Sequence, residues 1–411
     1  MKQRVTRTAM RGLTCLLMAA VAIGLYSGKA AAASGPCVYN NDRIISTWRN
    51  LANYPSMVIV IAHRGWWGSH PGTSNSCGAN VSASWTGMPE NSWYGVLAGL
   101  STGFEAAEVD IKMTKDGIPI LMHDFTLGRT TNIYQVEGGK KFDPYGGTGV
   151  NPRVDQTNWF GTIERTKLLT PDRKNVSDEA VPAFAQLLDY YKEGGSNGIL
   201  VLDVKDRASM KAVWQLMNNH VDHRGSLARN WVAVKFNMTT YPNPADLEAD
   251  LYTWADPHGK PGKYEPFLGL PVITNNMLDK MKNLLDVEQS YMHKDYTLGV
   301  EVNLNQPDGR LQKAYTAVGD DRYAVGIFNP IADPGASAGT GENMAFFKNT
   351  GQCCYRLNTV RYGDSRVDRW DWSFLYGLGY KRFDFITTDE PGKMLDDLQK
   401  KNLRNGNYLM Q

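Results

Sequence analysis

The sequence predicts an α/β fold, a TIM-type barrel in which eight parallel strands alternate with helices. Eight short apolar runs rich in β-branched residues recur along the 411-residue chain, and amphipathic stretches separate them. Such near-continuous apolar strands are typical of a parallel sheet that is buried on both faces. Eight units favour a closed barrel over an open sheet, and a barrel of this kind takes about 250 residues or more as one domain.

The expected elements follow one another in regular order, and the fifth strand is the weakest of them in the sequence. Strands are expected at Met57–Ala62, Ala106–Ile111, Gly198–Asp203, Trp231–Phe236, Leu270–Thr274, Leu298–Asn303, Tyr323–Phe328 and Asp384–Thr388. Helices are expected at Asn91–Leu100, Ala183–Lys192, Ser209–Asn219, Met277–Glu288 and Lys393–Lys400.

The first 33 residues stand apart from this barrel. Basic residues precede an apolar run, Leu13–Tyr26, and small residues follow it up to Ala33. This pattern predicts a secretory signal peptide cleaved near Ala33, and the run is too short to span a bilayer; a membrane anchor is the alternative. We therefore expect residues 34–411 to form a single barrel domain that is secreted or periplasmic and has no transmembrane segment.

The charge of the expected mature chain argues against nucleic acid as a partner. The full chain has 44 Lys and Arg residues against 42 Asp and Glu residues. Five of the basic residues and none of the acidic ones lie in residues 1–33, so cleavage changes the formal net charge from +2 to −3. Nucleic-acid binding usually requires a basic surface, which this balance does not supply.

Four cysteines follow the expected cleavage site: Cys37, Cys77, Cys353 and Cys354. An even number in an exported protein permits two disulfides, with three connectivities. We expect the adjacent Cys353 and Cys354 not to pair with each other, because vicinal geometry is strained. Links from Cys37 and Cys77 to this pair would join the two ends of the domain, and free buried thiols are the alternative.

A further strand-like run, Ile118–His123, is expected to form a hairpin arm rather than a barrel strand. Too few residues separate it from the preceding strand for a parallel crossover, which takes about ten or more. Asp116-Gly117 is a strong signal for a two-residue hairpin turn. Pairing about this turn would set Asp110 opposite His123, with Glu108 on the same face as Asp110.

Two long stretches without periodicity follow strand ends on the same side of the expected barrel. They are residues 66–88, rich in Gly, Ser, Asn and Trp, and residues 133–180, rich in Gly, Asp and Thr. Long loops at the C-terminal mouth of a barrel usually shape substrate access. Loops without a functional role are the alternative.

A series of short motifs lies in order at the expected strand ends. The motifs are His63-Arg64-Gly65, Pro89-Glu90-Asn91, Glu108-Val109-Asp110, His123-Asp124, Arg129-Thr130-Thr131, Asp203-Val204-Lys205 and Thr387-Thr388-Asp389-Glu390-Pro391. Each motif alone is weak, but their order and spacing are specific. The series resembles the glycerophosphodiester phosphodiesterase family, in the superfamily shared with phosphatidylinositol phospholipase C and sphingomyelinase D, most strongly over residues 63–132.

Three carboxylates are expected to meet at the mouth of the barrel. Glu108 and Asp110 are two residues apart on one strand, so both face the same side, and Asp203 ends the next barrel strand. Oxygen ligands without Cys or His favour a hard cation. The sequence therefore predicts one divalent cation, Ca²⁺ or Mg²⁺, which would neutralise phosphodiester oxygens. A solvated loop edge is the alternative.

His63 and His123 are the candidate catalytic residues. Cleavage of a phosphodiester needs one group to take a proton from the nucleophile and another to give a proton to the departing alkoxide. Because the pKa of imidazole lies near neutrality, one ring can be neutral while the other is protonated. The family resemblance implies the same pair, and the sequence does not assign the acid and the base.

The remaining candidates would bind substrate or orient other groups. Arg64 and Lys205 supply positive charge for the substrate phosphate. Glu90 is expected to hold Arg64 in place, because the resemblance implies the other three carboxylates as metal ligands. Asn91 would position its neighbours, and Asp124 would support the loop after the hairpin.

The substrate is left open by departures from the family pattern. The third ligand position usually carries Glu, whereas here it carries the shorter Asp203, and an aspartate followed two residues later by lysine also resembles the sphingomyelinase D branch. The stretches 66–88 and 133–180 replace shorter connections. Lys235 and Glu301 also fall near strand ends and could line the pocket.

The expected function is an exported, metal-dependent phosphodiesterase that hydrolyses glycerophosphodiesters to glycerol 3-phosphate and an alcohol. The first alternative is an enzyme of the phospholipase D or sphingomyelinase D type, which would act on intact or lyso-phospholipids through a cyclic phosphate. Contact with a membrane surface is left open for either function. A non-catalytic surface-binding barrel is more distant. A glycoside hydrolase with paired carboxylates is disfavoured by the two histidines and two cations.

Overall fold

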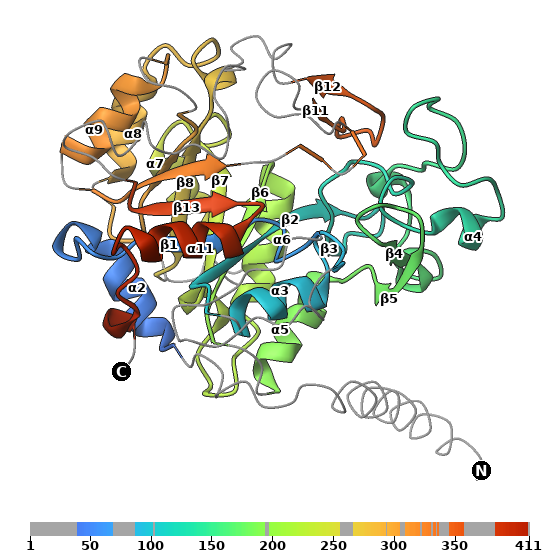
Figure 1. Ribbon diagram of the computed structural model, residues 1–411, viewed down its shortest axis with the longest axis horizontal. Coiled ribbons are helices and arrows are strands. Elements are labelled where there is room, and N and C mark those ends of the chain that lie inside the picture. The colour runs from blue at the N-terminus through green and yellow to red at the C-terminus, as the bar shows by residue number, and fades with distance from the viewer. Residues whose placement is uncertain are drawn as a thin grey trace.

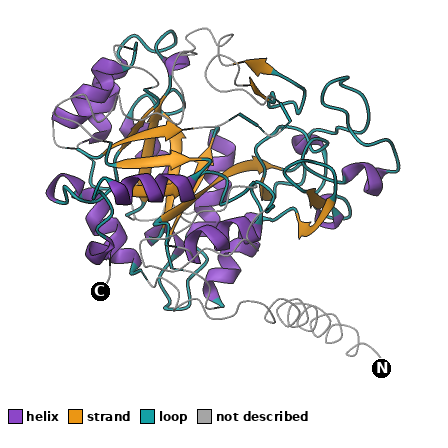
Figure 2. Cartoon of the chain, in the orientation of Figure 1, coloured by secondary structure: helices purple, strands orange, loops and turns teal. Residues whose placement is uncertain are grey.

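The computed structural model describes residues 39–68, 87–101, 103–193, 197–254, 266–292, 294–304, 309–320, 323–329, 332–333, 335–336, 345–356 and 383–409. Within these ranges, eight parallel strands form a closed barrel with helices around it (Figures 1 and 2). The strands are β1 (Ile59–Ala62), β2 (Ala106–Met113), β6 (Ile199–Val204), β7 (Val232–Asn237), β8 (Leu268–Ile273), β9 (Val300–Val302), β10 (Val325–Asn329) and β13 (Phe385–Thr388). The predicted barrel is confirmed, and each expected strand is present.

The barrel closes at β1, which pairs in parallel with both β13 and β2. Ile61 lies opposite Thr387 on one side and opposite Ala106 on the other. Beneath this seam, the buried Glu105 accepts hydrogen bonds from Val60 N at 2.8 Å and from Arg404 Nη1 at 2.9 Å. This contact ties the starts of β1 and β2 to the C-terminal end of the described chain.

The helices agree with the expected pattern, with one late start and some additions. They are α2 (Asn41–Arg49), α3 (Trp93–Ser101), α5 (Phe184–Lys192), α6 (Arg207–Met217), α7 (Pro244–Trp254), α8 (Leu284–Met292), α9 (Gln312–Asp320) and α11 (Pro391–Lys400). The expected helix Met277–Glu288 is wrong over its first half: a 3₁₀ turn, Asn275–Met277, and further turn residues precede α8, which begins at Leu284. Asn side chains compete with the backbone for hydrogen bonds, which favours such turns.

The hairpin arm forms, but its register is one residue away from the prediction. β3 (Pro119–Leu121) pairs antiparallel with β2, and Met122 N donates a hydrogen bond of 3.0 Å to Asp110 O. Asp110 therefore lies opposite Met122, and the predicted pairing with His123 is wrong. Because β3 ends before His123, strand alternation does not fix the direction of that side chain.

The length of the turn explains the shifted register. Gly117 N donates to Thr114 O at 3.0 Å, and Ile118 N donates to Thr114 Oγ1 at 2.9 Å, so three residues connect the strands instead of two. Gly117 adopts a left-handed φ of 80°, which is common at the end of three-residue hairpin loops. One added residue shifts every pair along the hairpin.

Residues 133–180 form a folded side lobe rather than an irregular loop. The lobe contains α4 (Ile133–Glu137) and a two-stranded sheet of β4 (Lys167–Leu169) and β5 (Val176–Ala180), beside the barrel in Figure 1. The lobe and the hairpin arm share a hydrophobic core that is separate from the core of the barrel. It consists of Ile120, Met122, Leu127, Ile133, Val154, Trp159, Ile163, Leu168, Val181 and Ala183. Of the other long stretch, residues 69–86 lie outside the described residues.

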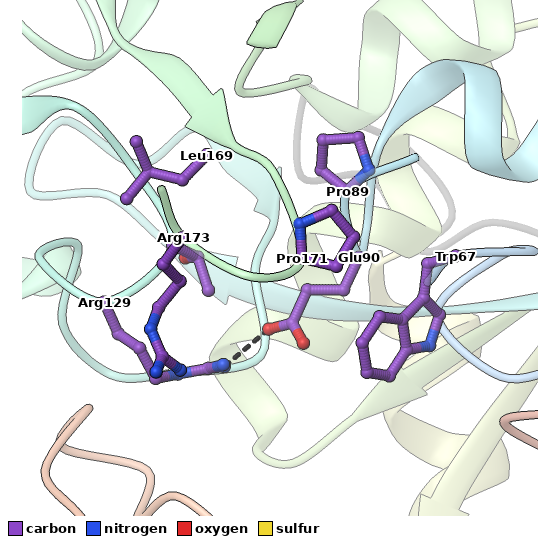
Figure 3. Close-up of a pocket in the computed structure, with 8 residues that line it drawn as sticks. Trp67, Pro89, Glu90, Arg129, Leu169, Pro171 and Arg173 are labelled. Atoms are coloured by element: carbon purple, nitrogen blue, oxygen red, sulfur yellow. Dashed lines mark hydrogen bonds and ion pairs between the residues drawn. The ribbon is translucent and has the colours of Figure 1, made fainter. Parts of the chain in front are cut away.

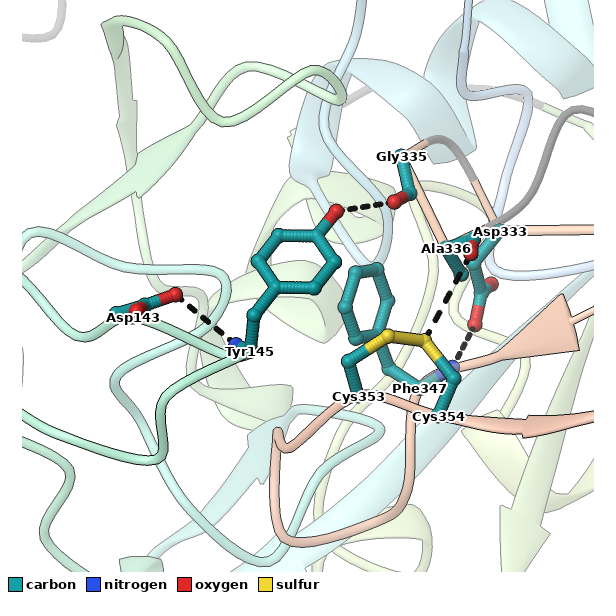
Figure 4. The surroundings of a disulfide bond; sticks show 8 residues. All are labelled: Asp143, Tyr145, Asp333, Gly335, Ala336, Phe347, Cys353 and Cys354. Carbon is teal, nitrogen blue, oxygen red and sulfur yellow. Dashed lines mark hydrogen bonds between the residues drawn. A yellow bond between two sulfur atoms is a disulfide. The ribbon is translucent and has the colours of Figure 1, made fainter.

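Cys353 and Cys354 form a disulfide with each other, which corrects the expectation that they would not pair (Figure 4). The pair lies in the short connection between β11 (Ala345–Phe346) and β12 (Tyr355–Arg356). Cys353 N donates to Pro144 O at 2.8 Å, so this connection is anchored to the side lobe. This disulfide leaves neither sulfur free for the expected links to Cys37 and Cys77, so that expectation is wrong; Cys37 and Cys77 themselves lie outside the described residues.

None of the helices in the described ranges combines the length and apolarity that a bilayer crossing needs.

Glu288 in α8 carries a testable consequence for stability. Its side chain is fully buried, neither carboxylate oxygen has a hydrogen-bond partner among the described residues, and burial raises its pKa to about 8. The folded state binds this proton more tightly than the unfolded chain does. The contribution of Glu288 to the free energy of unfolding is therefore most favourable below pH ~4.5 and is lost as the pH rises to about 8.

We therefore expect Glu288→Gln to unfold at a higher temperature than the wild type at pH 8 and to lose this part of the pH dependence. Thermal unfolding of both proteins from pH 5 to pH 9 measures the effect. The exposed Asp286→Asn on the same helix is the matched control. Equal melting temperatures of Glu288→Gln and wild type at pH 8 would show that Glu288 is not a buried, uncompensated acid.

Candidate functional site

Three carboxylates come together at the C-terminal ends of β2 and β6. The parallel register places Asp110 opposite Asp203, and Glu108 lies two residues earlier on the same face of β2. One oxygen atom from each of these side chains lies within 4.8 Å of the others, and all three residues are buried. The structure thus brings together the three residues that the sequence predicted as metal ligands.

The chemistry of this group fits a divalent cation. Glu108 Oε1 and Asp203 Oδ1 are buried and have no hydrogen-bond partner among the described residues. Burial, and then the nearby Asp110 and Asp203, raise the pKa of Glu108 to about 7, although His63 opposes this shift. Buried carboxylates that repel one another are destabilising unless a cation neutralises them, so these residues could hold a metal ion.

A strained turn after β1 fixes the position of Asp110. Arg64 and Asn91 both have left-handed backbone conformations, with φ of 55° and 54°, and Asn91 N donates to Arg64 O at 2.9 Å. The Asn91 side chain accepts from Asp110 N at 2.9 Å and donates to Asp110 Oδ2 at 3.1 Å. The turn also requires glycine at position 65, because a Cβ there would lie 2.7 Å from the backbone of Gly95 in α3.

Arg64 lies against several acidic groups of the site. Its backbone N donates to Glu108 Oε2 at 3.1 Å, and its Nη1 donates to Glu90 Oε2 at 2.9 Å. Its Nε lies 3.6 Å from Asp110 Oδ2. Glu90 therefore orients Arg64, and it is not part of the three-carboxylate group.

A chain of ion pairs runs from Glu90 to His123. Arg129 Nη2 donates to Glu90 Oε1 at 2.5 Å, shown in Figure 3, and Arg129 Nε donates to Asp124 Oδ2 at 2.5 Å. Asp124 Oδ1 in turn lies 2.8 Å from His123 Nδ1. Although burial opposes it, the charge of Arg129 and the hydrogen bonds from His123 and Arg129 hold the pKa of Asp124 below its usual range.

His123 borders the carboxylate group despite the shifted hairpin register. Burial would raise the pKa of Asp110, but the positive charges of His123 and Arg64 lower it below its usual range. The ring of His123 is partly exposed, at 22% of its side-chain area. The prediction that His123 returns to the carboxylates is thus supported by proximity, while the proposed pairing behind it is wrong.

His63 directly follows β1 and lies beside Glu108. Its Nε2 is 3.8 Å from Glu108 Oε2, and its Nδ1 donates to Asp389 Oδ1 at 2.6 Å. Burial lowers the pKa of His63, but Asp389 and Glu108 outweigh this and raise it above its usual value. Trp67 Nε1 also donates to Asp389 Oδ1, at 3.3 Å.

Asp389 is a site residue that the sequence analysis did not select. The signal was present, because Asp389 directly follows β13, the last barrel strand, in the terminal motif. In a parallel barrel every strand end reaches the same mouth. A carboxylate at that position therefore belonged with the candidates.

Two lysines border the carboxylate group. Lys205 Nζ pairs with Asp203 Oδ2, and 48% of the Lys205 side chain is exposed. Lys235, opposite Asp203 on β7, is buried and lies 2.8 Å from Glu301 Oε1. Thr387 Oγ1 donates to the other oxygen of Glu301 at 2.6 Å. Lys235 and Glu301 therefore form a buried pair beside the site, rather than an open pocket wall.

The motif series found in the sequence matches a known protein family. Residues 63–242 match the model of the glycerophosphoryl diester phosphodiesterase family. The family resemblance is confirmed. The matched segment begins at His63 and contains the three carboxylates, His123 and Lys205.

Curated relatives match over short segments. Human glycerophosphoinositol inositolphosphodiesterase is 31% identical over 110 residues, 25% of this chain and 20% of the relative. Rat glycerophosphodiester phosphodiesterase 1 is 37% identical over 75 residues, 18% of this chain and 17% of the relative. The matched part of the chain thus spans about a fifth of the length of these relatives.

Solved structures support the fold. The crystal structure of a candidate glycerophosphoryl diester phosphodiesterase from Silicibacter pomeroyi superposes with a TM-score of 0.50 at 18% identity, covering 88% of this chain and 98% of that chain. At this identity the likeness concerns the fold alone.

The contact between His63 and Asp389 generates a test. We expect Asp389→Asn to lower the pKa of His63, because a facing negative charge and its hydrogen bond are removed. Titration of the histidine rings by NMR, in the metal-free protein, measures this. The exposed Asp295→Asn serves as the control and should leave His63 unchanged. An unchanged titration in Asp389→Asn would mean that this carboxylate does not set the protonation of His63.

Proposed function

We propose that this protein is an exported, metal-dependent phosphodiesterase that hydrolyses glycerophosphodiesters to glycerol 3-phosphate and an alcohol. One observation carries the proposal: three buried carboxylates form one group, His63 Nε2 lies 3.8 Å from Glu108 Oε2, and His123 is near enough to lower the pKa of Asp110. The family match over residues 63–242 supports the same reaction class.

Glu108, Asp110 and Asp203 would hold one Ca²⁺ or Mg²⁺ ion. When bound, this ion neutralises phosphate oxygens and the charge that develops at phosphorus. The guanidinium of Arg64 lies next to Asp110, its backbone N–H donates to Glu108, and Lys205 adds an ammonium group next to Asp203. These groups favour an anionic phosphodiester over a neutral substrate such as a glycoside.

Each of the two histidines is held by a carboxylate at its Nδ1 atom. A carboxylate can only accept hydrogen bonds, so each contact places a proton on Nδ1: His63 donates to Asp389, and His123 donates to Asp124. Nε2 of each ring remains for proton transfer with the substrate. One ring would accept a proton from the nucleophile, and the other would donate one to the departing alkoxide.

Export is proposed from the N-terminal pattern of a basic segment, an apolar run and small residues up to Ala33. The disulfide between Cys353 and Cys354 agrees with an oxidising compartment. N-terminal sequencing of the mature protein from the culture medium or periplasm would test this, and an intact Met1 would contradict it.

The reaction is tested with purified protein, Ca²⁺ or Mg²⁺, and glycerophosphoethanolamine. We expect release of glycerol 3-phosphate, and a fall in kcat of about 10²- to 10⁴-fold in His63→Ala and in His123→Ala. His223→Ala, at an exposed position, is the matched control and should retain activity. Phosphorus NMR of the products separates the alternatives, because a cyclic phosphate formed from lysophospholipid or sphingomyelin would favour the phospholipase D type of reaction.

The metal site is tested by a readout that does not depend on turnover. We expect added Ca²⁺ or Mg²⁺ to raise the melting temperature of protein that has been freed of metal with EDTA. At an ion concentration a hundred times the Kd, the free energy of unfolding should increase by about 2.7 kcal/mol. Asp203→Asn should remove most of this increase, whereas Asp178→Asn, on the exposed side of the lobe, should not. An equal increase in Asp203→Asn and wild type would show that the ion binds elsewhere.

A further inference from the structure

The direction of the His123 side chain is not set by a strand. β3 ends at Leu121, and Met122 lies between the strand end and His123. Asp124 holds the ring at Nδ1, but Asp124 follows His123 in the same loop. The orientation of the peptide group that joins Met122 to His123 therefore contributes directly to where the ring points, and this peptide group is held by the contacts of Met122 O.

Met122 O lacks the donor that a regular hairpin would give it. In a hydrogen-bonded antiparallel pair, the two opposite residues exchange both N–H···O bonds. Asp110 and Met122 make one of these bonds, from Met122 N to Asp110 O at 3.0 Å. The reciprocal donor, Asp110 N, instead donates to Asn91 Oδ1 at 2.9 Å. The ladder between β2 and β3 accordingly ends one pair earlier, at Ile111 and Leu121. The contact that fixes Asp110 in the site thus removes a bond from the end of the hairpin arm.

Lys112 supplies the missing donor from the same strand. Its Nζ donates to Met122 O at 3.3 Å. Strand alternation places Lys112 on the face of β2 that also carries Glu108 and Asp110. Met122 is buried, and a buried carbonyl without a donor is destabilising. The side chain of Lys112 therefore replaces a backbone bond that the site has taken from the hairpin arm.

Lys112 also contacts the chain beyond His123. Its Nζ lies 5.3 Å from the ring centre of Phe125. An ammonium group at this distance from an aromatic ring is attracted to it. Lys112 thus touches Met122 on one side and Phe125 on the other side of the two-residue segment that consists of His123 and Asp124.

The ammonium group of Lys112 is buried among charges, since 8% of the residue is exposed. Its charge is attracted by Asp110, Asp203 and Asp124. Lys205 repels it. Burial of a charged group is costly unless opposite charges and hydrogen bonds compensate for it, and here three acidic groups and Met122 O do so. The surroundings therefore keep a charged donor in place at the end of the hairpin arm.

We propose that Lys112 is a positioning residue of the reaction centre, whose ammonium group replaces the strand bond at Met122 O and thereby orients His123 towards the three carboxylates. The inference rests on the proposed phosphodiesterase function, in which His123 transfers a proton. It adds Lys112 to the residues that the reaction requires, although this side chain acts through His123 rather than on the substrate.

Lys112→Met tests this role on turnover, because methionine has a similar length and packs against Phe125 but has no N–H donor. With glycerophosphoethanolamine as substrate, we expect kcat to fall about ten- to a hundredfold, since a displaced catalytic group has an effect of this size, and KM to change less. Lys112→Arg, which keeps a charged donor, should recover most of the lost activity. Lys115→Met, at an exposed position of the same hairpin, is the matched control and should behave like the wild type. A wild-type kcat in Lys112→Met would overturn the proposal.

A double-mutant cycle shows whether Lys112 acts through His123. If it does, Lys112→Met should have little further effect on kcat when His123→Ala is already present, because the two residues act as a unit. An equal fold-decrease in the wild type and in His123→Ala would give Lys112 a role independent of His123 and would overturn the proposal. Lys112→Gln, whose amide ends one bond short of the lysine ammonium, serves for the same cycle if Lys112→Met does not fold, with the same expected result.

NMR of the histidine rings separates failure of this inference from failure of the proposed function, because it needs no turnover. In the metal-free protein, we expect the His123 ring signals to shift and broaden in Lys112→Met. The His63 signals should stay as in the wild type and show that the barrel is intact. If no diester is hydrolysed but the His123 signals change in this way, Lys112 positions the ring and the proposed reaction fails. If the diester is hydrolysed and neither kcat nor the ring signals change in Lys112→Met, the reaction stands and the inference fails.

Discussion

The parallel register between β2 and β6 is the constraint on which the site depends. It places Asp110 opposite Asp203, with Glu108 on the same face, inside a barrel mouth that excludes most water. Three buried negative charges are unfavourable together, and the surrounding cations are arranged against that cost. Arg64 contacts Glu108 and Asp110, and Lys205 contacts Asp203. If either strand slipped by one residue, its carboxylates would point outwards, into the layer between the barrel and the helices.

Charges further from the mouth follow from the same constraint. Arg64 is fixed by Glu90, Glu90 is shared with Arg129, and Arg129 is fixed by Asp124, which reaches His123. Each buried ion in this series has an opposite charge on both sides, which is the condition under which buried ions are tolerated. His123 is thus connected to the three-carboxylate group through this series of ion pairs, whereas His63 is held by Asp389.

The barrel and its carboxylates are predictable from sequence because each depends on local patterns. Eight apolar runs indicate the strands, and the Glu108-Val109-Asp110 motif places two side chains on one face by alternation alone. The hairpin register is not predictable in this way, since it depends on whether two or three residues form the turn at Gly117. The contact of Asp389 with His63 joins residues 326 positions apart. The order within residues 133–180 was missed because its core is shared with the hairpin arm, so the apolar residues show no period of their own.

The side lobe is braced by a distant part of the chain. Residues 345–356 receive hydrogen bonds from Phe125, Thr126 and Asn151, and Cys353 donates one back to Pro144. The same segment provides Phe347, which packs against Arg129 and Arg173. Residues 133–180 and 345–356 therefore form one structural unit. A chimaera that exchanged the lobe with a relative would keep its packing only if both segments were exchanged together.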